Sequence, residues 1–357
     1  MPRTVSILLA LFTLSALPAL AGDPSPEALA EAGHYKRLRA IVEPRVKANP
    51  SDAEANYLLS RVKLAFVETD AALALAEKAV ALDATKARYH LQLARVCGRM
   101  AQRAGMFKGM SLARRFRRET ETALALDPKY IDARSALMEF YWEAPGIAGG
   151  DKKKAHQLAD EILRLDAARG YLAQASLAER EKTDQAKLEG VYRKALEADP
   201  RSYEVQITLA SFYLADAQKK YDLAEKHAGE AQKLDPDRGG AYAMLAITYA
   251  SAERWQQLDG ALAQAEKNVP DNFNPYYQAG RILLTNGSDL PRAERYFRKY
   301  LTQEPEGNTP PPAAAHWRLG LVLEKQGRKK EAIAELETAV RLDPNFEPAK
   351  KDLKRLK

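Results

Sequence analysis

Cysteine is almost absent, and its scarcity excludes several kinds of site. Cys97 is the single cysteine among 357 residues, so no intramolecular disulfide can form, and no Cys/His spacing of a zinc site is present. Because it occupies an apolar position of an expected helix, we expect a buried, inert thiol. The chain also lacks GxSxG, HExxH and Walker phosphate-loop motifs. We therefore expect no catalytic residue, no cofactor, no metal site and no enzymatic activity.

Long apolar runs are also missing, apart from the first residues. Arg3 precedes an apolar stretch that ends at Pro18, and the small residues Ala19 and Ala21 follow. This pattern predicts a signal peptide over residues 1–21, cleaved after Ala21. The alternative is an uncleaved anchor, but the apolar run is shorter than the ~20 residues that span a bilayer. We expect an exported protein that does not span the membrane after cleavage, periplasmic if the source is Gram-negative.

Sustained alternation of apolar and polar residues, the mark of strands, is lacking, and a helical period takes its place. In residues 199–236, apolar residues recur at spacings of three and four in two runs, and Asp235-Pro236 ends the second. Such spacing predicts two helices that each bury one face. A proline cannot continue a helix and moves the residue before it out of helical geometry. The stretch therefore predicts one helix hairpin in an all-α protein.

The same plan recurs along the chain. Each repeat ends at a similar turn, as in Leu126-Asp127-Pro128 and Leu342-Asp343-Pro344, and a large apolar residue stands beside a small one in most first helices, as in Leu319-Gly320. Counted from these stops, the first helices are expected to begin at Ala53, Ala87, Ile131, Gly170, Tyr203, Gly239, Phe273, Ala313 and Glu347.

These features resemble the tetratricopeptide repeat (TPR) family, whose unit is a helix hairpin of about 34 residues with small residues at the helix contact and a terminal proline. The resemblance implies a right-handed α-solenoid of TPR-like hairpins. We expect an incomplete repeat over residues 22–52, about eight repeats over residues 53–346, and a charged capping helix over residues 347–357.

Two repeats are longer than the others. The extra residues fall near 104–110 and 144–150, where we expect enlarged loops between the two helices of a hairpin. The second loop, Ala-Pro-Gly-Ile-Ala-Gly-Gly, leads to a helix that opens with three lysines, and helix starts favour anions. This pattern predicts an anion-binding edge, with a packed structural turn as the alternative. The edge comprises Gly149, Gly150, Lys152, Arg114 and Arg118.

The resemblance also implies a binding groove, because set positions of the first helices line the concave face in this family and hold extended peptides. The alternative is an ordinary solvated inner face. Carried over to this chain, the groove contains Arg61, Arg88, Arg95, Arg99, Glu139, Trp142, Glu143, Tyr277, Arg281 and Trp317.

The partner is expected to be a protein or peptide segment in the cell envelope, bound by a scaffold or adaptor. The formal charge of +7 favours acidic partners, so an anionic glycan bound by the loops and the arginine row is the alternative. Nucleic acid is not expected for an exported protein. Self-association through the ends of the solenoid stays open.

Overall fold

The computed structural model describes residues 24–215, 218–307 and 309–357, and every regular element in these ranges is a helix. The expected signal peptide lies outside the described residues. The helices are α1 (Pro26–Ala32), α2 (Tyr35–Ala48), α3 (Ala53–Ala65), α4 (Thr69–Leu82), α5 (Ala87–Ala101), α6 (Met106–Leu126), α7 (Ile131–Glu143), the 3-10 helix η1 (Gly146–Ala148), α8 (Lys152–Leu165), α9 (Ala167–Arg180), α10 (Gln185–Ala198), α11 (Tyr203–Leu214), α12 (Tyr221–Leu234), α13 (Gly239–Ser251), α14 (Trp255–Asn268), α15 (Asn274–Asn286), α16 (Leu290–Tyr300), α17 (Pro312–Lys325), α18 (Lys329–Leu342) and α19 (Glu347–Leu356).

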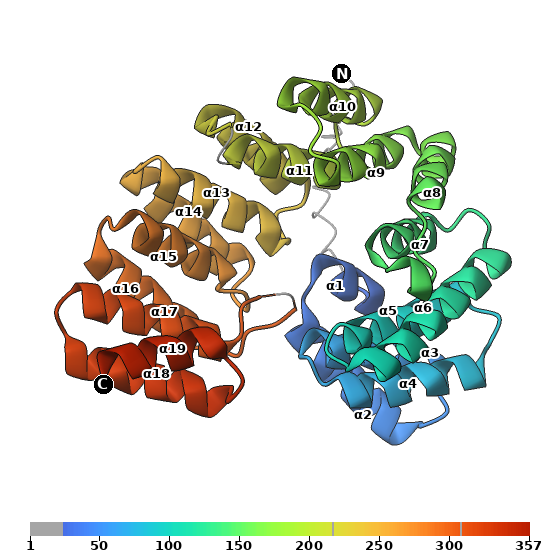
Figure 1. Cartoon of the computed structure of the whole chain (residues 1–357), viewed down its shortest axis with the longest axis horizontal. Coiled ribbons are helices and arrows are strands. Elements are labelled where there is room, and N and C mark those ends of the chain that lie inside the picture. The colour runs from blue at the N-terminus through green and yellow to red at the C-terminus, as the bar shows by residue number, and fades with distance from the viewer. Residues whose placement is uncertain (1–23, 216–217, 308) are drawn as a thin grey trace, which may run out of the picture.

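The helices pack as consecutive hairpins, from α1–α2 to α17–α18, and α19 follows the last of them. Figure 1 shows that the hairpins stack side by side along an arch. This arrangement confirms the all-α fold predicted from the periodicity and the solenoid of hairpins implied by the family resemblance. We call the odd-numbered helices from α1 to α17 the first helices of their hairpins, and the even-numbered helices from α2 to α18 the second helices.

An aspartate ends many of the second helices. Asp83, Asp127, Asp199 and Asp343 all have extended backbone angles at the C-terminal cap of a helix. Each carboxylate accepts a hydrogen bond from the backbone N–H two residues later, at 2.9–3.0 Å. This local turn offers the backbone an alternative to helix, and it explains why the chain reverses at these four stops.

Small residues sit where the two helices of a hairpin touch. A Cβ placed on Gly280 of α15 would lie 3.2 Å from the ring of Phe297 in α16, which is completely buried. A Cβ on Gly320 of α17 would lie 3.0 Å from Leu336 in α18. The close approach of these helices therefore depends on a missing side chain opposite a large one.

The two long repeats differ from one another. Most of the residues expected to form a loop near 104–110 instead belong to α6, which begins at Met106 and is 21 residues long. A run without proline or a helix-breaking pair can simply extend a helix N-terminally, because each added residue gains a backbone hydrogen bond. The second insertion does form a loop, built around η1.

The N-terminal hairpin contacts the C-terminal half of the chain, so the arch is closed on itself. Lys36 at the start of α2 donates from its backbone N–H to Glu306 Oε2 at 2.6 Å and from Nζ to the carbonyl oxygen of Asp271 at 2.6 Å. Arg39 pairs with Glu304 at 2.7 Å. Figure 1 shows the loop before α17 reaching towards the blue helices α1 and α2. We call these contacts the closure.

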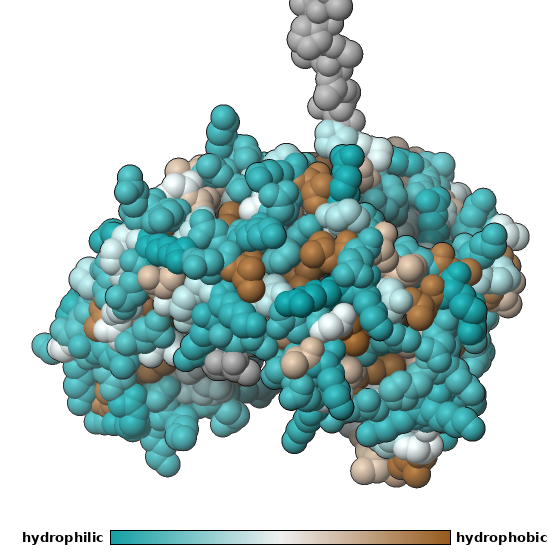
Figure 2. Space-filling view, turned by 90° about the horizontal axis from the view of Figure 1, so that it is seen from above, coloured by the Kyte–Doolittle hydropathy of each residue, from teal (hydrophilic) through white to brown (hydrophobic). Residues whose placement is uncertain are grey.

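The face seen from above is mainly polar. Figure 2 shows hydrophobic residues in small, separate groups among hydrophilic ones on the face seen from above. Among the described residues, no helix combines the length and the apolar character needed to cross a membrane.

Candidate functional site

Ion pairs link successive first helices across the repeats. Arg61 of α3 pairs with Glu27 of α1 at 2.7 Å, and Arg88 of α5 pairs with Glu54 of α3 at 2.5 Å. Further pairs join α5 to α7, α7 to α9 and α11 to α13: Arg95–Asp132, Arg169–Asp132, Arg180–Glu143 and Arg238–Glu204. We call this series the ion-pair ladder, and the surface that carries it the first-helix face.

Three of the five predicted groove arginines, Arg61, Arg88 and Arg95, belong to the ladder, but the strength of their internal contacts differs. The Arg61 side chain is only 13% exposed and also donates to the Tyr57 hydroxyl. Arg95 is 40% exposed, and its contact with Asp132 is long at 3.4 Å. Arg99 is partly buried. Among the ladder arginines of α3 and α5, Arg95 therefore has the loosest intramolecular contact.

The predicted acidic and aromatic groove residues of α7 lie beside this arginine row in the stack. Glu139 and Glu143 are exposed, and Trp142 is partly buried. Lys152 Nζ of α8 lies 4.5 Å from the centre of the Trp142 ring, a cation–π distance. One face of this tryptophan is thus covered by the chain itself.

The predicted groove residues of the C-terminal half are mostly occupied by internal contacts. Tyr277 is buried among aromatic residues, and its hydroxyl accepts a hydrogen bond from Arg318 at 2.8 Å. Arg281 donates to Gln278 at 3.0 Å, and burial next to Arg318 lowers its pKa. Trp317 donates from its indole nitrogen to Asp352 of α19 at 2.8 Å. In this half, the residues carried over from the family pattern mainly hold neighbouring helices together.

The glycine loop between α7 and α8 is a tightly packed turn. The N–H groups of Gly149 and Gly150 donate to Gly146 and Pro145, at 3.0 and 3.1 Å, and the N–H of Asp151 donates to Tyr141 at 2.8 Å. The Asp151 carboxylate caps α8 by accepting a hydrogen bond from the N–H of Lys154. Because these donors are already used, the loop offers no ready set of N–H groups for an anion.

Steric crowding explains the glycines of this loop without a ligand. A Cβ on Gly150 would lie 1.8 Å from the carbonyl oxygen of Ala144, and Gly149 has a φ of +98° with Arg117 Nη1 close by. The three charged residues of the predicted anion edge are all exposed: Arg114, Arg118 and Lys152. Arg118 nonetheless donates to Glu119 at 3.1 Å.

Exposed apolar side chains mark both insertions. Phe107 at the start of α6 is 87% exposed, and Met106 and Ile147 are nearly as open. Their positions follow from the insertions, but the sequence alone did not indicate that these side chains point outwards.

A hollow of about 440 Å³ opens between α9, α10 and α11. Its lining includes Leu188, Tyr192 and Phe212, and the Tyr192 hydroxyl donates to Glu179 at 2.6 Å. None of the predicted binding residues lies in this lining.

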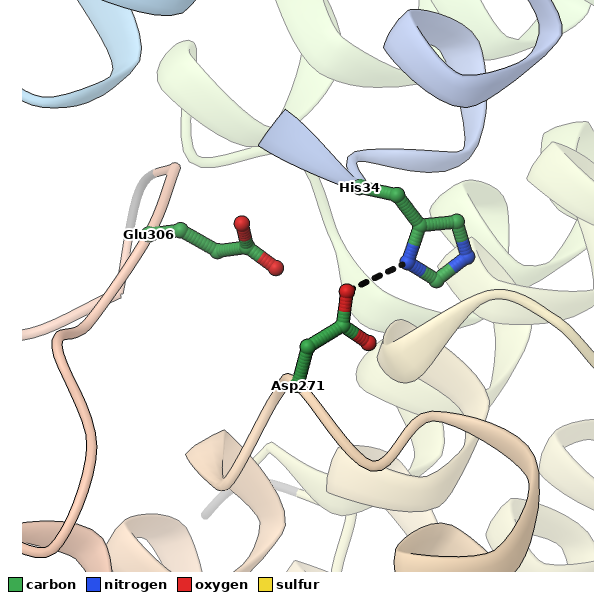
Figure 3. Close-up of side chains that lie close together, drawn as sticks. All are labelled: His34, Asp271 and Glu306. Atoms are coloured by element: carbon green, nitrogen blue, oxygen red, sulfur yellow. Dashed lines mark ion pairs between the residues drawn. The ribbon is translucent and has the colours of Figure 1, made fainter. Parts of the chain in front are cut away.

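The closure brings together three side chains that sequence analysis did not connect. His34 lies in the turn between α1 and α2, Asp271 in the turn between α14 and α15, and Glu306 in the loop between α16 and α17. One donor atom of each lies within 4.8 Å of the others. Figure 3 shows the Glu306 and Asp271 carboxylates directed towards the same side of the His34 ring. We call these three residues the closure cluster.

Burial and neighbouring charges shift the pKa values of the cluster. Burial raises the pKa of Glu306 to about 7, and the nearby Asp271 carboxylate adds to the rise. Burial acts against the charged form of His34, but Asp271 and Asp237 outweigh it and raise its pKa. For Asp271, burial is outweighed by His34 and Arg37, which hold its pKa at about 2. The charges of these three side chains therefore depend on one another and on Arg37 and Asp237.

Comparisons with known proteins agree with the fold. Residues 277–345 match the family model described as tetratricopeptide repeat. No curated protein matches the sequence significantly. The structure of yeast Tom70 is similar, with a TM-score of 0.54 and 16% identity over 93% of this chain and 79% of the other.

Two further structures resemble the chain less closely. A tetratricopeptide repeat protein from Parabacteroides merdae has a TM-score of 0.46 and 15% identity over 74% of this chain and 98% of its own. PilW, titled a type IV pilus biogenesis factor, has a TM-score of 0.46 and 18% identity over 62% of this chain and 98% of its own.

Proposed function

We propose that this tetratricopeptide-repeat protein is an exported scaffold without catalytic activity, which binds a segment of a partner protein on its first-helix face. Repeat proteins of this kind typically mediate protein–protein interactions, and their extended faces are made by the stacking of the repeats. The proposal concerns the α5–α7 part of the face most directly.

The observation that supports this location is the combination of side chains between α5 and α7. Arg88 and Arg95 each keep 40% of their side chains exposed, although both have an acidic partner. A guanidinium has five N–H donors in a fixed fork, so one internal ion pair leaves donors for a carboxylate of the partner. Trp142 adds a partly covered aromatic surface, and arginine and tryptophan are enriched among residues that dominate binding energy.

The ion-pair ladder determines how this surface binds a partner segment. Arg88 is held by Glu54 at 2.5 Å before any partner arrives, whereas Arg95 contacts Asp132 more loosely, at 3.4 Å. Preorganisation of this kind lowers the entropy lost on binding. A partner carboxylate competes with the internal acid, so the net gain per contact is small and selectivity depends on several contacts together.

Export to the cell envelope is part of the proposal and depends on the N-terminal sequence. The positive start, the short apolar run and the Ala-Leu-Ala segment before Gly22 support it. Sequencing the N-terminus of the protein purified from its source would test it, since cleavage after Ala21 is the expected result.

The test of binding is a crosslinking pull-down from the envelope fraction with the chain from Gly22. The native protein is compared with the triple variant Arg88→Ala, Arg95→Ala, Trp142→Ala. A matched control carries Arg193→Ala and Lys233→Ala, two exposed cations of second helices. A protein recovered with the native form and the control, but lost with the triple variant, is the expected result.

Two outcomes would count against this proposal. Equal recovery by all three proteins would exclude the α5–α7 surface. Recovery of an anionic glycan instead of a protein, lost when Arg114, Arg118 and Lys152 are replaced by alanine, would favour the glycan alternative. Steep weakening with salt would accompany that outcome, because contacts between exposed charges are screened.

A further inference from the structure

The closure cluster is built from three segments that are distant in sequence. His34 comes from the N-terminal hairpin, whereas Asp271 and Glu306 come from turns between hairpins of the C-terminal half. His34 and Glu306 are only 2% and 3% exposed. Polar side chains buried to this extent normally have hydrogen-bond partners.

The outer atoms of the cluster are held by neighbouring groups. Asp271 Oδ1 accepts a hydrogen bond from Arg37 at 3.0 Å, and Glu306 Oε2 accepts one from the Lys36 backbone N–H at 2.6 Å. The Oδ2 atom of Asp237 lies 3.2 Å from His34 Nε2, an ion-pair contact, although this nitrogen makes no hydrogen bond. Each of the three residues is thus contacted on the side away from the other two.

Two inner oxygen atoms have no hydrogen-bond partner. Asp271 Oδ2 and Glu306 Oε1 are buried and have no hydrogen-bond partner. His34 Nδ1 and Asp271 Oδ2 form an ion pair at 3.6 Å, drawn as a dashed line in Figure 3, which is too long for a hydrogen bond. Figure 3 shows this nitrogen on the side of the ring that faces the two carboxylates. Leaving a buried carboxylate oxygen without a partner is costly, which indicates that a further group completes the site.

We propose that the closure cluster binds one divalent transition-metal ion of the zinc and manganese class, with His34 Nδ1, Asp271 Oδ2 and Glu306 Oε1 as ligands. One imidazole nitrogen and two carboxylate oxygens suit these ions. An all-oxygen site would be expected for calcium or magnesium, and a thiolate for softer ions.

The geometry needs only a small adjustment to accept the ion. Two ligands of a tetrahedral zinc ion, each about 2.1 Å from the metal, are roughly 3.4 Å apart. His34 Nδ1 and Asp271 Oδ2 are already at 3.6 Å. The three ligand atoms lie within 4.8 Å of one another. The main change needed is therefore that the carboxylate of Glu306, which has the longer side chain, moves towards the other two ligands.

The surroundings resemble those of established metal sites. Metal-bound histidines commonly donate their other ring N–H to a carboxylate, which fixes the tautomer and orients the ring. Asp237 Oδ2 lies 3.2 Å from His34 Nε2 and is not yet hydrogen-bonded to it, so a small reorientation would let it play this part. The metal ion would link the N-terminal hairpin to the C-terminal half, so its binding energy would add to the closure.

The experiment uses the mature chain from Gly22, stripped of metal with a chelator and then dialysed. Zinc, manganese and magnesium chlorides are titrated separately by calorimetry, and cobalt(II) is added as a spectroscopic probe. We expect one zinc or manganese ion per chain, visible cobalt d–d bands, a saturable rise in melting temperature and no comparable effect of magnesium.

Three variants assign the ligands. Glu306→Gln and His34→Ala should each lose the bound ion, whereas Asp237→Asn should lower the affinity about 10–100-fold, as expected for an outer partner. Glu304→Gln is the matched control, because it removes the Arg39 ion pair of the closure but no ligand, and it should bind as the native chain does. Circular dichroism without metal verifies that each variant is folded.

The proposal is overturned if no ion binds to the folded native chain with one-to-one stoichiometry. It is equally overturned if Glu306→Gln, folded as judged by circular dichroism, binds zinc as tightly as the native chain, since the ion would then be held by other groups such as the exposed pair His156 and Glu181.

Discussion

The closure can be weakened without replacing any metal-ligand candidate or core residue. Arg37 pairs with Asp271 at 3.0 Å, and Arg39 pairs with Glu304 at 2.7 Å. Replacing Arg37 and Glu304 by alanine removes both pairs. It leaves Arg39 in place over the Phe66 ring, 4.4 Å from its centre, so packing inside the N-terminal half is preserved.

The size of the effect follows from exposure. The Arg39–Glu304 pair is solvated on both sides and contributes less than about 1 kcal/mol, as exposed pairs do. Arg37 is about one-third exposed, but its acceptor Asp271 is largely buried, so this charge-assisted bond contributes about 1 kcal/mol or slightly more. Together they amount to about 1.5 kcal/mol, which corresponds to roughly a tenfold shift towards the open form.

Native-state hydrogen exchange measures this shift. The amides of α1 and α2 should exchange about tenfold faster in the double variant, because opening of the closure frees the N-terminal hairpin. The amides of α8 should be unaffected. Arg45→Ala is the control, since Arg45 of α2 pairs with Asp52 at 2.8 Å inside the N-terminal half. Unchanged exchange of α1 and α2 in the double variant would refute the view that these ion pairs hold the closure.

Three further predictions concern the rest of the chain. Phe297→Ala should lower the free energy of unfolding by about 3–5 kcal/mol, because the ring is completely buried, whereas Phe107→Ala should change it by less than about 0.5 kcal/mol; urea denaturation compares the two. Gly150→Ala should loosen the α7–α8 loop, since its Cβ would overlap the Ala144 carbonyl oxygen at 1.8 Å, and faster exchange of the loop amides would reveal it. Burial raises the pKa of the Cys97 thiol to about 11, so a thiol reagent at pH 8 should label it only after denaturation. Because the folded thiol keeps its proton to a higher pH than the unfolded one, this residue should reduce stability as the pH rises above about 9; rapid labelling of the folded chain would contradict the burial.

The fold was largely predictable because local sequence patterns determine where its helices begin and end. The stops at Asp127 and Asp343 set the helix ends, and α5, α7, α11 and α13 begin at the residues that those stops predict. The start of α9 differs, at Ala167 rather than Gly170, because Asp166 caps this helix directly after ending α8. A local side-chain preference thus decided the boundary over the repeat period.

The candidate sites were less predictable, for two physical reasons. A family position tells which way a side chain points but not what it meets, so Tyr277 was expected in a groove and is buried against neighbouring aromatic rings. The closure cluster depends on the summed curvature of the whole stack, which brings His34 to Asp271 and Glu306. No spacing in the sequence encodes that meeting.

The closure has a consequence for how the chain can change in evolution. An open stack of repeats can gain or lose one hairpin and only becomes longer or shorter, because each unit touches its neighbours alone. Here Arg37 must still reach Asp271 after the chain has run through all the intervening hairpins. Removing or adding one hairpin would rotate and displace one side of that contact relative to the other. The number of hairpins between α2 and α15 is therefore constrained by the contact between Arg37 and Asp271 at the two ends of this segment.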